Sequence, residues 1–154
     1  MQANQLGVRL VLWAGVVPAP VPQSALEAIE KLEVERSGDD VGGFQLTLRA
    51  EKTVGVEFDA VRSPQLCVGS RILIGVLMGI SPEWLLDGVS THRELLPGDK
   101  PGTGRLVLTG RDLSSVMDRM DVVMSYPGCT DSVIAAAILV RYAMYGVVPT
   151  VTPT

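Results

Sequence analysis

The residues in this sequence that could do chemistry are few and lie far apart. The single histidine, His92, falls within a strand-like segment, and no acid or nucleophile near it in the sequence would orient it as a general base. Asp39 and Asp40 stand in a turn with glycine on both sides, which explains them better than metal binding does. We therefore expect a protein that is not an enzyme and that holds neither a metal nor a cofactor.

Two further motifs also lack the context that their chemistry needs. The run Gly102-Thr103-Gly104 is too short for a phosphate-binding loop, and it precedes a strand-like segment instead of a helix. Cys67 and Cys129 belong to no CxxC motif and have no histidine nearby in the sequence. Two free thiols are the favoured interpretation, with a single disulfide bridge as the alternative.

The composition favours contact with other protein subunits. The 154 residues suffice for one domain with a small helical appendage. Hydrophobic residues make up 47% of the chain, the mean hydropathy is +0.30, and charged residues reach only 19%, below the usual quarter. A surface so poor in charge must expose apolar area, most often at subunit contacts, although an apolar monomer is the alternative.

Charge and hydropathy also exclude several partners. The net charge is −4 and the basic residues are scattered, so we expect no stable binding to nucleic acid. The apolar segment Leu6–Val17 contains Arg9 and follows no basic residue, which argues against a signal peptide. The apolar run Val133–Val140 is far shorter than the roughly twenty residues that span a membrane. We expect a soluble, cytoplasmic protein.

Sixteen glycines and ten prolines separate short apolar segments. Such residues mark the turns between strands, so this pattern predicts a mainly β domain. The first strand is expected around Val8–Trp13, and the prolines of Val16–Pro22 should interrupt any ladder after it. Ser24–Glu27 has the spacing of a capping box, which predicts a short helical turn. The alternation in Leu32–Arg36 and Phe44–Ala50 predicts a hairpin.

The later strands are longer or more apolar. Arg71–Met78, which contains Ile74 and Leu77, is apolar on both faces, so one face should pack in the barrel and the other against a neighbouring subunit or the following helices. Trp84–Leu96 predicts one long strand or hairpin arm with a bulge at Gly88. Arg105–Thr109 predicts the closing strand, with its two leucines turned inward.

The hydrophobic period changes from two to 3.6 after Gly110. Helical spacing begins at Asp112, and a second helix should cover roughly Thr130–Tyr145, ending at a Gly146 cap. We therefore expect a β-barrel domain over residues 1–110 and a helical extension with a linker over 111–154.

The chain resembles the phage late control protein D family, the baseplate hub proteins of contractile tails, and their relatives in type VI secretion and extracellular contractile injection systems. The resemblance covers about two thirds of the chain, and the order of its motifs is more specific than any one of them. The residues that carry it are Gly43–Leu48, Val68–Val76, Leu86–Ser90, Leu106–Ser114 and Arg141–Pro149.

This resemblance implies a small β-barrel similar to a tail-tube subunit, which joins the inner tube to the baseplate within an assembled phage-tail-like particle. The implied partners are copies of the chain in a ring of three, with a ring of six as the alternative, together with a tail-tube protein, the spike and other baseplate proteins. Family members usually run to several hundred residues with a second barrel and often a spike, so this chain departs from the family in length.

The remaining expectations concern the function and its residues. A tail-tube or tube-initiator protein of the same machinery is one alternative function, and a small-molecule-binding β-barrel is another. The aromatic Trp84 beside Leu85 and Leu86 is typical of an interface anchor, so these three residues, with Ile74 and Leu77, are the predicted subunit contacts.

Overall fold

The structure of the chain is a computed structural model that describes residues 8–36, 41–51, 62–119 and 121–152. The chain divides into two compact units, Met1–Ser115 and Val116–Thr154. The first unit holds the β-strands, and the second is helical.

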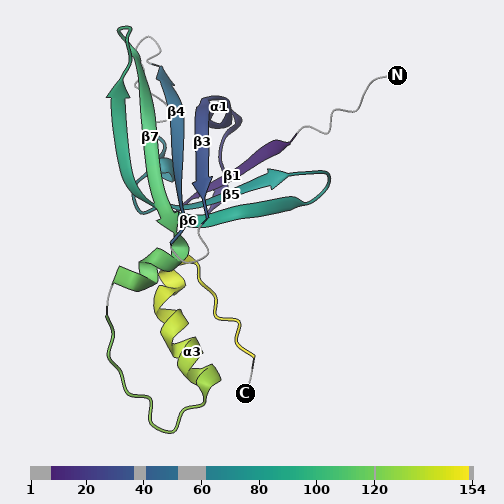
Figure 1. Cartoon of the computed structure of the whole chain (residues 1–154), viewed down its shortest axis with the longest axis vertical. Coiled ribbons are helices and arrows are strands. Elements are labelled where there is room, and N and C mark those ends of the chain that lie inside the picture. The colour runs from purple at the N-terminus through teal and green to yellow at the C-terminus, as the bar shows by residue number, and fades with distance from the viewer. Residues whose placement is uncertain (1–7, 37–40, 52–61, 120, 153–154) are drawn as a thin grey trace. The chain divides into compact units, whose positions relative to one another are not determined.

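The first unit is built on one antiparallel sheet of seven strands in the order β2-β1-β5-β6-β7-β4-β3 (Figure 1). The expected mainly β fold is therefore confirmed. In chain order the strands are β1 (Arg9–Gly15), β2 (Ala19–Pro20), β3 (Ile29–Glu35), β4 (Gly43–Glu51), β5 (Arg71–Leu77), β6 (Pro82–Pro97) and β7 (Thr103–Asp112).

The sheet is not closed into the expected barrel. Its two edges are β2 and β3, and within the described residues no pairing joins them. A short connection, Val21–Ala28, runs between these edges and contains the helix α1 (Gln23–Glu27). Val21 N–H donates to the Leu12 carbonyl at 3.0 Å, and Arg49 N–H donates to the Ala28 carbonyl at 2.7 Å. Because so short a connection has little reach, the two edges must lie near each other and the sheet must curl.

Prolines explain why β2 is only two residues long. Trp13 pairs with Pro20 and Ala14 with Ala19, while Val21 N–H already points to β1. Alternate residues of a strand direct their N–H groups to opposite sides, so the missing N–H of Pro20 falls on the side away from β1. Proline is therefore tolerated here, at the outer edge of the sheet.

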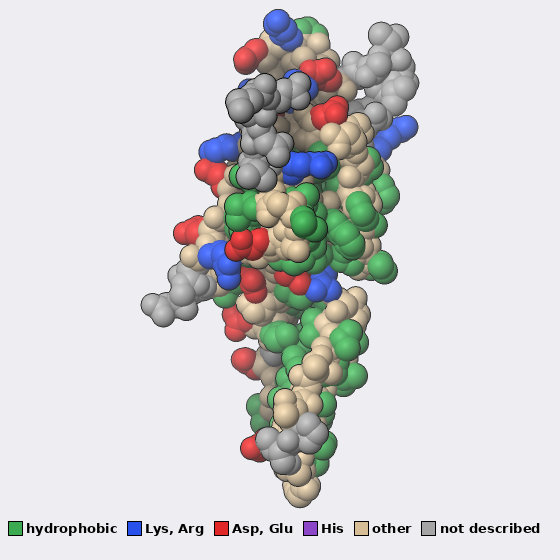
Figure 2. Space-filling model, turned by 90° about the vertical axis from the view of Figure 1, so that its right-hand side faces the viewer, with side chains coloured by type: hydrophobic (Ala, Val, Ile, Leu, Met, Phe, Trp, Pro, Cys, Tyr) green, Lys and Arg blue, Asp and Glu red, His purple; other side chains and the backbone are tan. Residues whose placement is uncertain are grey.

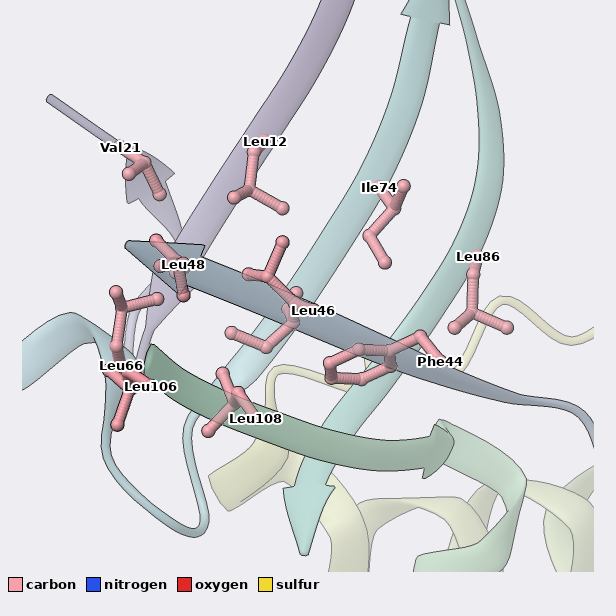
Figure 3. Packing of buried hydrophobic residues seen from close by; sticks show 12 residues of the cluster. Leu12, Val21, Phe44, Leu46, Leu48, Leu66, Ile74, Leu86, Leu106 and Leu108 are labelled. Carbon is pink, nitrogen blue, oxygen red and sulfur yellow. The ribbon is translucent and has the colours of Figure 1, made fainter. Parts of the chain in front are cut away.

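The concave side of the sheet holds the core of the first unit (Figure 3). The alternating residues of β4 and β7 point inward as the sequence predicts, and Leu46 lies opposite Leu108 in the ladder. The core consists of Leu12, Ala14, Val21, Phe44, Leu46, Leu48, Leu66, Ile72, Ile74, Leu86, Leu106 and Leu108.

Two glycines make room for the largest side chain of this core, Phe44. A Cβ added at Gly110 would overlap the Phe44 ring and would lie 2.6 Å from the Val89 carbonyl oxygen. A Cβ at Gly88 would lie 3.3 Å from Phe44 Cε1. The ring therefore lies against the bare backbone of β6 and β7.

The long strand β6 is confirmed, but its bulges lie elsewhere than expected. Gly88 pairs regularly with Ile72. The register shifts instead between the partners of Ile74 and Gly75, and again between Ser90 and His92. The predicted bulge at Gly88 is wrong because Gly88 serves close packing against Phe44 and the backbone of Arg111.

The helical turn after the prolines is confirmed as α1, but its predicted capping box is wrong. The N-cap residue is Pro22, and no side chain caps the helix. Ser24 lies one residue inside the helix, and Gln23 Nε2 donates to Glu27 Oε1 at 3.1 Å. Pro22 occupies the N-cap position and has no side-chain oxygen. The hydroxyl of Ser24 lies two residues further along and does not cap the helix.

The second unit contains α3 (Asp131–Leu139) and the 3₁₀ helix η3 (Val140–Tyr145), which together cover the predicted second helix. Gly146 ends it with φ 76°, as expected of a left-handed cap. The segment after β7 is also helical, but η2 (Leu113–Arg119) is a 3₁₀ helix. Among the described helices, none is both long and apolar enough to cross a membrane.

Candidate interaction surface

The convex side of β1, β5 and the start of β6 carries an apolar surface. Val11 lies opposite Gly75, and Trp13 opposite Leu73, on the side away from the core. Trp84 also pairs with Gly75, from the other neighbouring strand. Residues paired across a ladder share a face. We call the outward residues Val11, Trp13, Leu73, Leu77 and Trp84 the tryptophan face.

Two indole rings form the centre of the tryptophan face. The rings of Trp13 and Trp84 pack edge to face, with centroids 6.0 Å apart and planes at 84°. The Trp84 ring lies over Gly75, where a Cβ would come within 2.9 Å of Trp84 Cε3. Nonetheless 37% of Trp13 and 42% of Trp84 remain exposed. This aromatic pair is therefore ordered by its own contacts and still accessible to a partner.

A bulge decides which side chains of β6 reach this face. Ile74 pairs with Leu86, and Gly75 pairs with Trp84, so Leu85 is an extra residue in β6. Without the bulge, Trp84 and Leu86 would point to the same side, because side chains alternate along a strand. The extra residue directs Trp84 outward and turns Leu86 into the core.

The structure separates the five predicted contact residues into two groups. Trp84 is exposed, Leu77 is half-buried on the convex side, and Leu85 is half-buried at the bulge. Ile74 and Leu86 are buried in the core of their own chain, so they are not accessible to a neighbouring subunit. Trp13 was not predicted to be a contact residue. Its position next to the core residue Leu12 was the available signal, because neighbouring side chains of a strand point to opposite faces.

The apolar surface continues to the turn between β5 and β6. Ile80 is 99% exposed there and Met78 is also exposed. No charged residue occurs from Val76 to Pro82. Figure 2 shows hydrophobic side chains gathered over this part of the first unit. Contiguous apolar surface of this kind marks an interaction site.

An ion pair borders the tryptophan face. Arg71 Nε donates to Asp87 Oδ1 at 2.8 Å, and a second nitrogen of the guanidinium donates to Oδ2, which makes the pair bidentate. The hydrogen bond to Asp87 raises the pKa of Arg71, against a smaller opposite effect of burial. The pair joins β5 to β6 beside the apolar side chains.

The convex side of β3, β4 and β7 is polar by contrast. Glu33 lies opposite Gln45, which lies opposite Thr109. Arg105 Nε donates to Glu30 Oε2 at 2.8 Å across the sheet. The convex surface of one sheet is thus divided into an apolar part and a charged part with both signs.

The residues first considered for chemistry lie apart in the described structure. His92 is exposed opposite Thr109, and within the described parts of the chain no three His, Cys, Asp or Glu residues gather as metal ligands would. Cys67 and Cys129 are both free, as predicted. Asp39 and Asp40 lie outside the described residues.

No family model matches the sequence, and no curated protein matches it significantly. Two solved structures are similar to the chain in fold. The tail protein from Neisseria meningitidis MC58 has a TM-score of 0.54 and 14% identity over 89% of this chain and 34% of that one. The 43 kDa tail protein of prophage MuSo2 from Shewanella oneidensis has a TM-score of 0.52 and 18% identity over 79% of this chain and 32% of its own.

This chain therefore spans about a third of the length of either tail protein. At such low identity, the likeness shows only that the fold is shared with these two tail proteins, one of which comes from a prophage. It covers most of the present chain in both comparisons.

Proposed function

We propose that this chain is a structural component of a phage-tail-like particle, a baseplate hub protein that joins the inner tube to the baseplate by contact alone. The observation that carries the proposal is the fold shared with two tail proteins, one of them from a prophage, over 89% and 79% of the chain. The order of the hub-like motifs in the sequence supports the same role. The likeness covers only about a third of either tail protein, so the remaining parts of a hub would come from other chains or domains.

The division of the convex surface supports a role in assembly. A component that works by contact needs at least one apolar surface ordered before binding, and the Trp13–Trp84 pair provides one. Exposed aromatic residues with aliphatic neighbours are the usual anchors of protein interfaces. A ring of three copies is the proposed arrangement, with the tail-tube protein and the spike as further partners.

A tail-tube or tube-initiator protein is the second candidate. The described residues form one curled sheet, whereas a hub ring with sixfold character would need two such units in each of three copies. Six copies of a one-sheet chain would instead make a ring like that of a tube. A small-molecule-binding protein is not favoured, because leucine, isoleucine and phenylalanine side chains fill the concave side of the sheet (Figure 3).

Native mass spectrometry with electron microscopy tests the proposal. The purified chain is mixed with a purified tail-tube protein, and ring particles are expected that contain both. Three copies per ring favour the hub and six favour the tube. The absence of any ring and of any complex at high protein concentration would overturn both functions.

Removal of the central aromatic side chain gives a sharper test of the contact surface. Trp84→Ala is expected to weaken assembly about thirtyfold, since interface anchors contribute about 2 kcal/mol or more. The exposed Leu96→Ala, on the convex side away from the tryptophan face, is the matched control. Assembly is measured by sedimentation velocity, and folding by circular dichroism. Unchanged assembly of the folded Trp84 variant would remove this surface from the interface.

A further inference from the structure

The outer edge of β3 is unpaired. β3 is the last strand in the sheet order, and β4 is the only described element that runs beside it (Figure 1). Arg49 of β4 directs its N–H toward the start of β3. Backbone groups two residues apart in a strand point to the same side, so Gln45 bonds in turn to its ladder partner Glu33. The N–H and C=O groups of Leu32 and Val34, on either side of Glu33, therefore point to the unpaired edge.

The side chains of β3 determine what kind of strand this edge can accept. Ile29, Leu32 and Val34 pack beside the core but are only half-buried. On the convex side, Glu33 and Glu35 are exposed. A strand added here would complete the burial of the apolar row if its concave face were apolar. Its convex face would have to be free of acidic side chains, since like charges on neighbouring strands repel.

The segment Val147–Thr152 of the second unit has this pattern. It forms neither helix nor strand, and its backbone makes no hydrogen bond to any other described residue. It carries no charge, and valine and threonine favour extended backbone. Half-buried apolar residues alternate with exposed ones. The half-buried set is Val147, Pro149 and Val151, and the exposed set is Val148, Thr150 and Thr152.

The positions of the prolines determine which edge of this segment can pair. Pro149 and Pro153 are four residues apart in the sequence, so in a strand both missing N–H groups would fall on the same edge. The other edge keeps the donors of Val148, Thr150 and Thr152. The same device limits β2 to pairing on one side. The segment is therefore suited to be an edge strand, with one edge that can pair and one that cannot.

We propose that the segment Val147–Thr152 of one copy of this chain adds to the outer edge of β3 in a second copy, as a parallel strand. In a parallel pair, residues that lie side by side share a face and direct their N–H groups the same way. Pro149 beside Leu32 and Val151 beside Val34 would then extend the apolar concave face. The edge without proline N–H groups would point outward.

An antiparallel pair does not fit the same residues. There the residue opposite Leu32 must donate to it, and placing the apolar set on the concave face would bring Pro149 or Pro153, which have no donor, into the ladder. Turning the segment over would instead put Thr150 against the core and the apolar set beside the glutamates. Only the parallel arrangement satisfies the hydrogen bonds and the two faces together.

A second copy is the occupant that these features favour. The neutral segment brings no carboxylate to Glu33, and the Thr150 hydroxyl beside it can donate to the glutamate. Each copy offers one segment and one edge, and neither has a partner among the described residues. The contact is thus head to tail, a type that can close into a ring. It goes beyond the proposed function, because it joins copies without any tail partner.

Sedimentation velocity over a concentration series, with the complete chain alone, tests the contact. The parent is expected to associate as its concentration rises. Thr150→Pro removes a donor on the pairing edge and should raise the Kd of association about tenfold. Val151→Pro removes an N–H that points outward and should raise the Kd much less. Circular dichroism checks that both variants are folded, and equal effects of the two prolines would contradict the assigned edge.

Charge reversal tests whether β3 is the acceptor. Thr150 lies beside Glu33 in the proposed register, so Thr150→Glu should weaken association several-fold by repulsion. Thr150→Lys should strengthen it for the opposite reason. Glu33→Lys should restore association to the Thr150→Glu chain, and failure of this rescue would overturn the pairing with β3.

Hydrogen exchange distinguishes this contact from any other association. The amides of Leu32 and Val34 should exchange more slowly as the parent associates, while the Glu33 amide, already bonded to β4, should not change. A parent that stays monomeric at every concentration would overturn the proposal. Protection of these two amides in the monomer would do so as well, because the edge would then be paired within one chain. Complexes with a purified tail-tube protein are measured separately, so the proposed function stands or fails independently.

Discussion

Replacement of Ile74 by aspartate is expected to cost about 4 kcal/mol or more of folding free energy and to leave little folded protein. Ile74 is fully buried, and its neighbours across the sheet, Leu12 and Leu86, are core residues without polar groups. A carboxylate there has no partner within the core cluster, and total stability is only about 5–15 kcal/mol. Urea unfolding followed by circular dichroism measures the loss.

Leu77→Asp is the informative comparison, because Leu77 lies in the same strand but is half-buried on the convex side. It should cost only about 1 kcal/mol of stability and should act on assembly instead. Ile74→Val controls for the change of shape and should cost about 1 kcal/mol. If Ile74→Asp and Leu77→Asp destabilise the chain equally, the assignment of the two faces of β5 is incorrect.

The second large effect is expected at the glycine beside Phe44. Gly110→Ala places a methyl group into the Phe44 ring and 2.6 Å from the Val89 carbonyl oxygen. Either the ring or β6 must move, so we expect a loss of about 3 kcal/mol, at the upper end for an overpacked core. Thermal and urea unfolding provide the measurement, and Thr109→Ala, one residue earlier on the convex side, is the control.

A double-mutant cycle with Phe44→Leu shows whether the ring is the cause. The shorter side chain leaves room for the added methyl group, so Gly110→Ala should cost less in that background than in the parent. Strict additivity of the two substitutions would mean that the contact with the Val89 backbone, and not the ring, determines the loss.

The clearest strands were predictable because one face of each is buried. Phe44, Leu46 and Leu48 alternate with polar residues, and the sheet buries the apolar set as period-two patterning requires. The hairpin of β3 and β4 followed from the same pattern and from the glycine-rich turn between them. Such local regularities need no knowledge of the other strands.

Closure of the sheet and the positions of the bulges were not predictable. Whether the edges of a curled sheet pair depends on the connection Val21–Ala28, in which a proline and a helix occupy the place of a strand. The bulge at Leu85 results from the register of two strands, which leaves no mark in the sequence of either one. Glycine is common at bulges, which is why a bulge was expected at Gly88. The glycine is needed there for another reason, since the Phe44 ring packs close to its backbone.

The candidate surface was therefore only partly predictable. Trp84 was identified from its residue type and its aliphatic neighbours. The bulge that turns Trp84 and Leu86 to opposite faces of the sheet could not be predicted from the sequence. Trp13 became relevant only through Gly75, across which the two indole rings meet. A contact between strands so far apart in the chain requires the sheet order.

That sheet order also bears on how the chain is made. β1 is synthesised well before its main partner β5, so Arg9 can pair with Leu77 only after β5 has been made. At translation rates of roughly 5–20 residues per second, an apolar strand remains unpaired for on the order of several seconds. Pairings between such distant segments also make folding slow. The nascent chain is consequently most vulnerable to aggregation before β5 emerges, and a chaperone that binds the segment around Leu10–Trp13 would protect it at that stage.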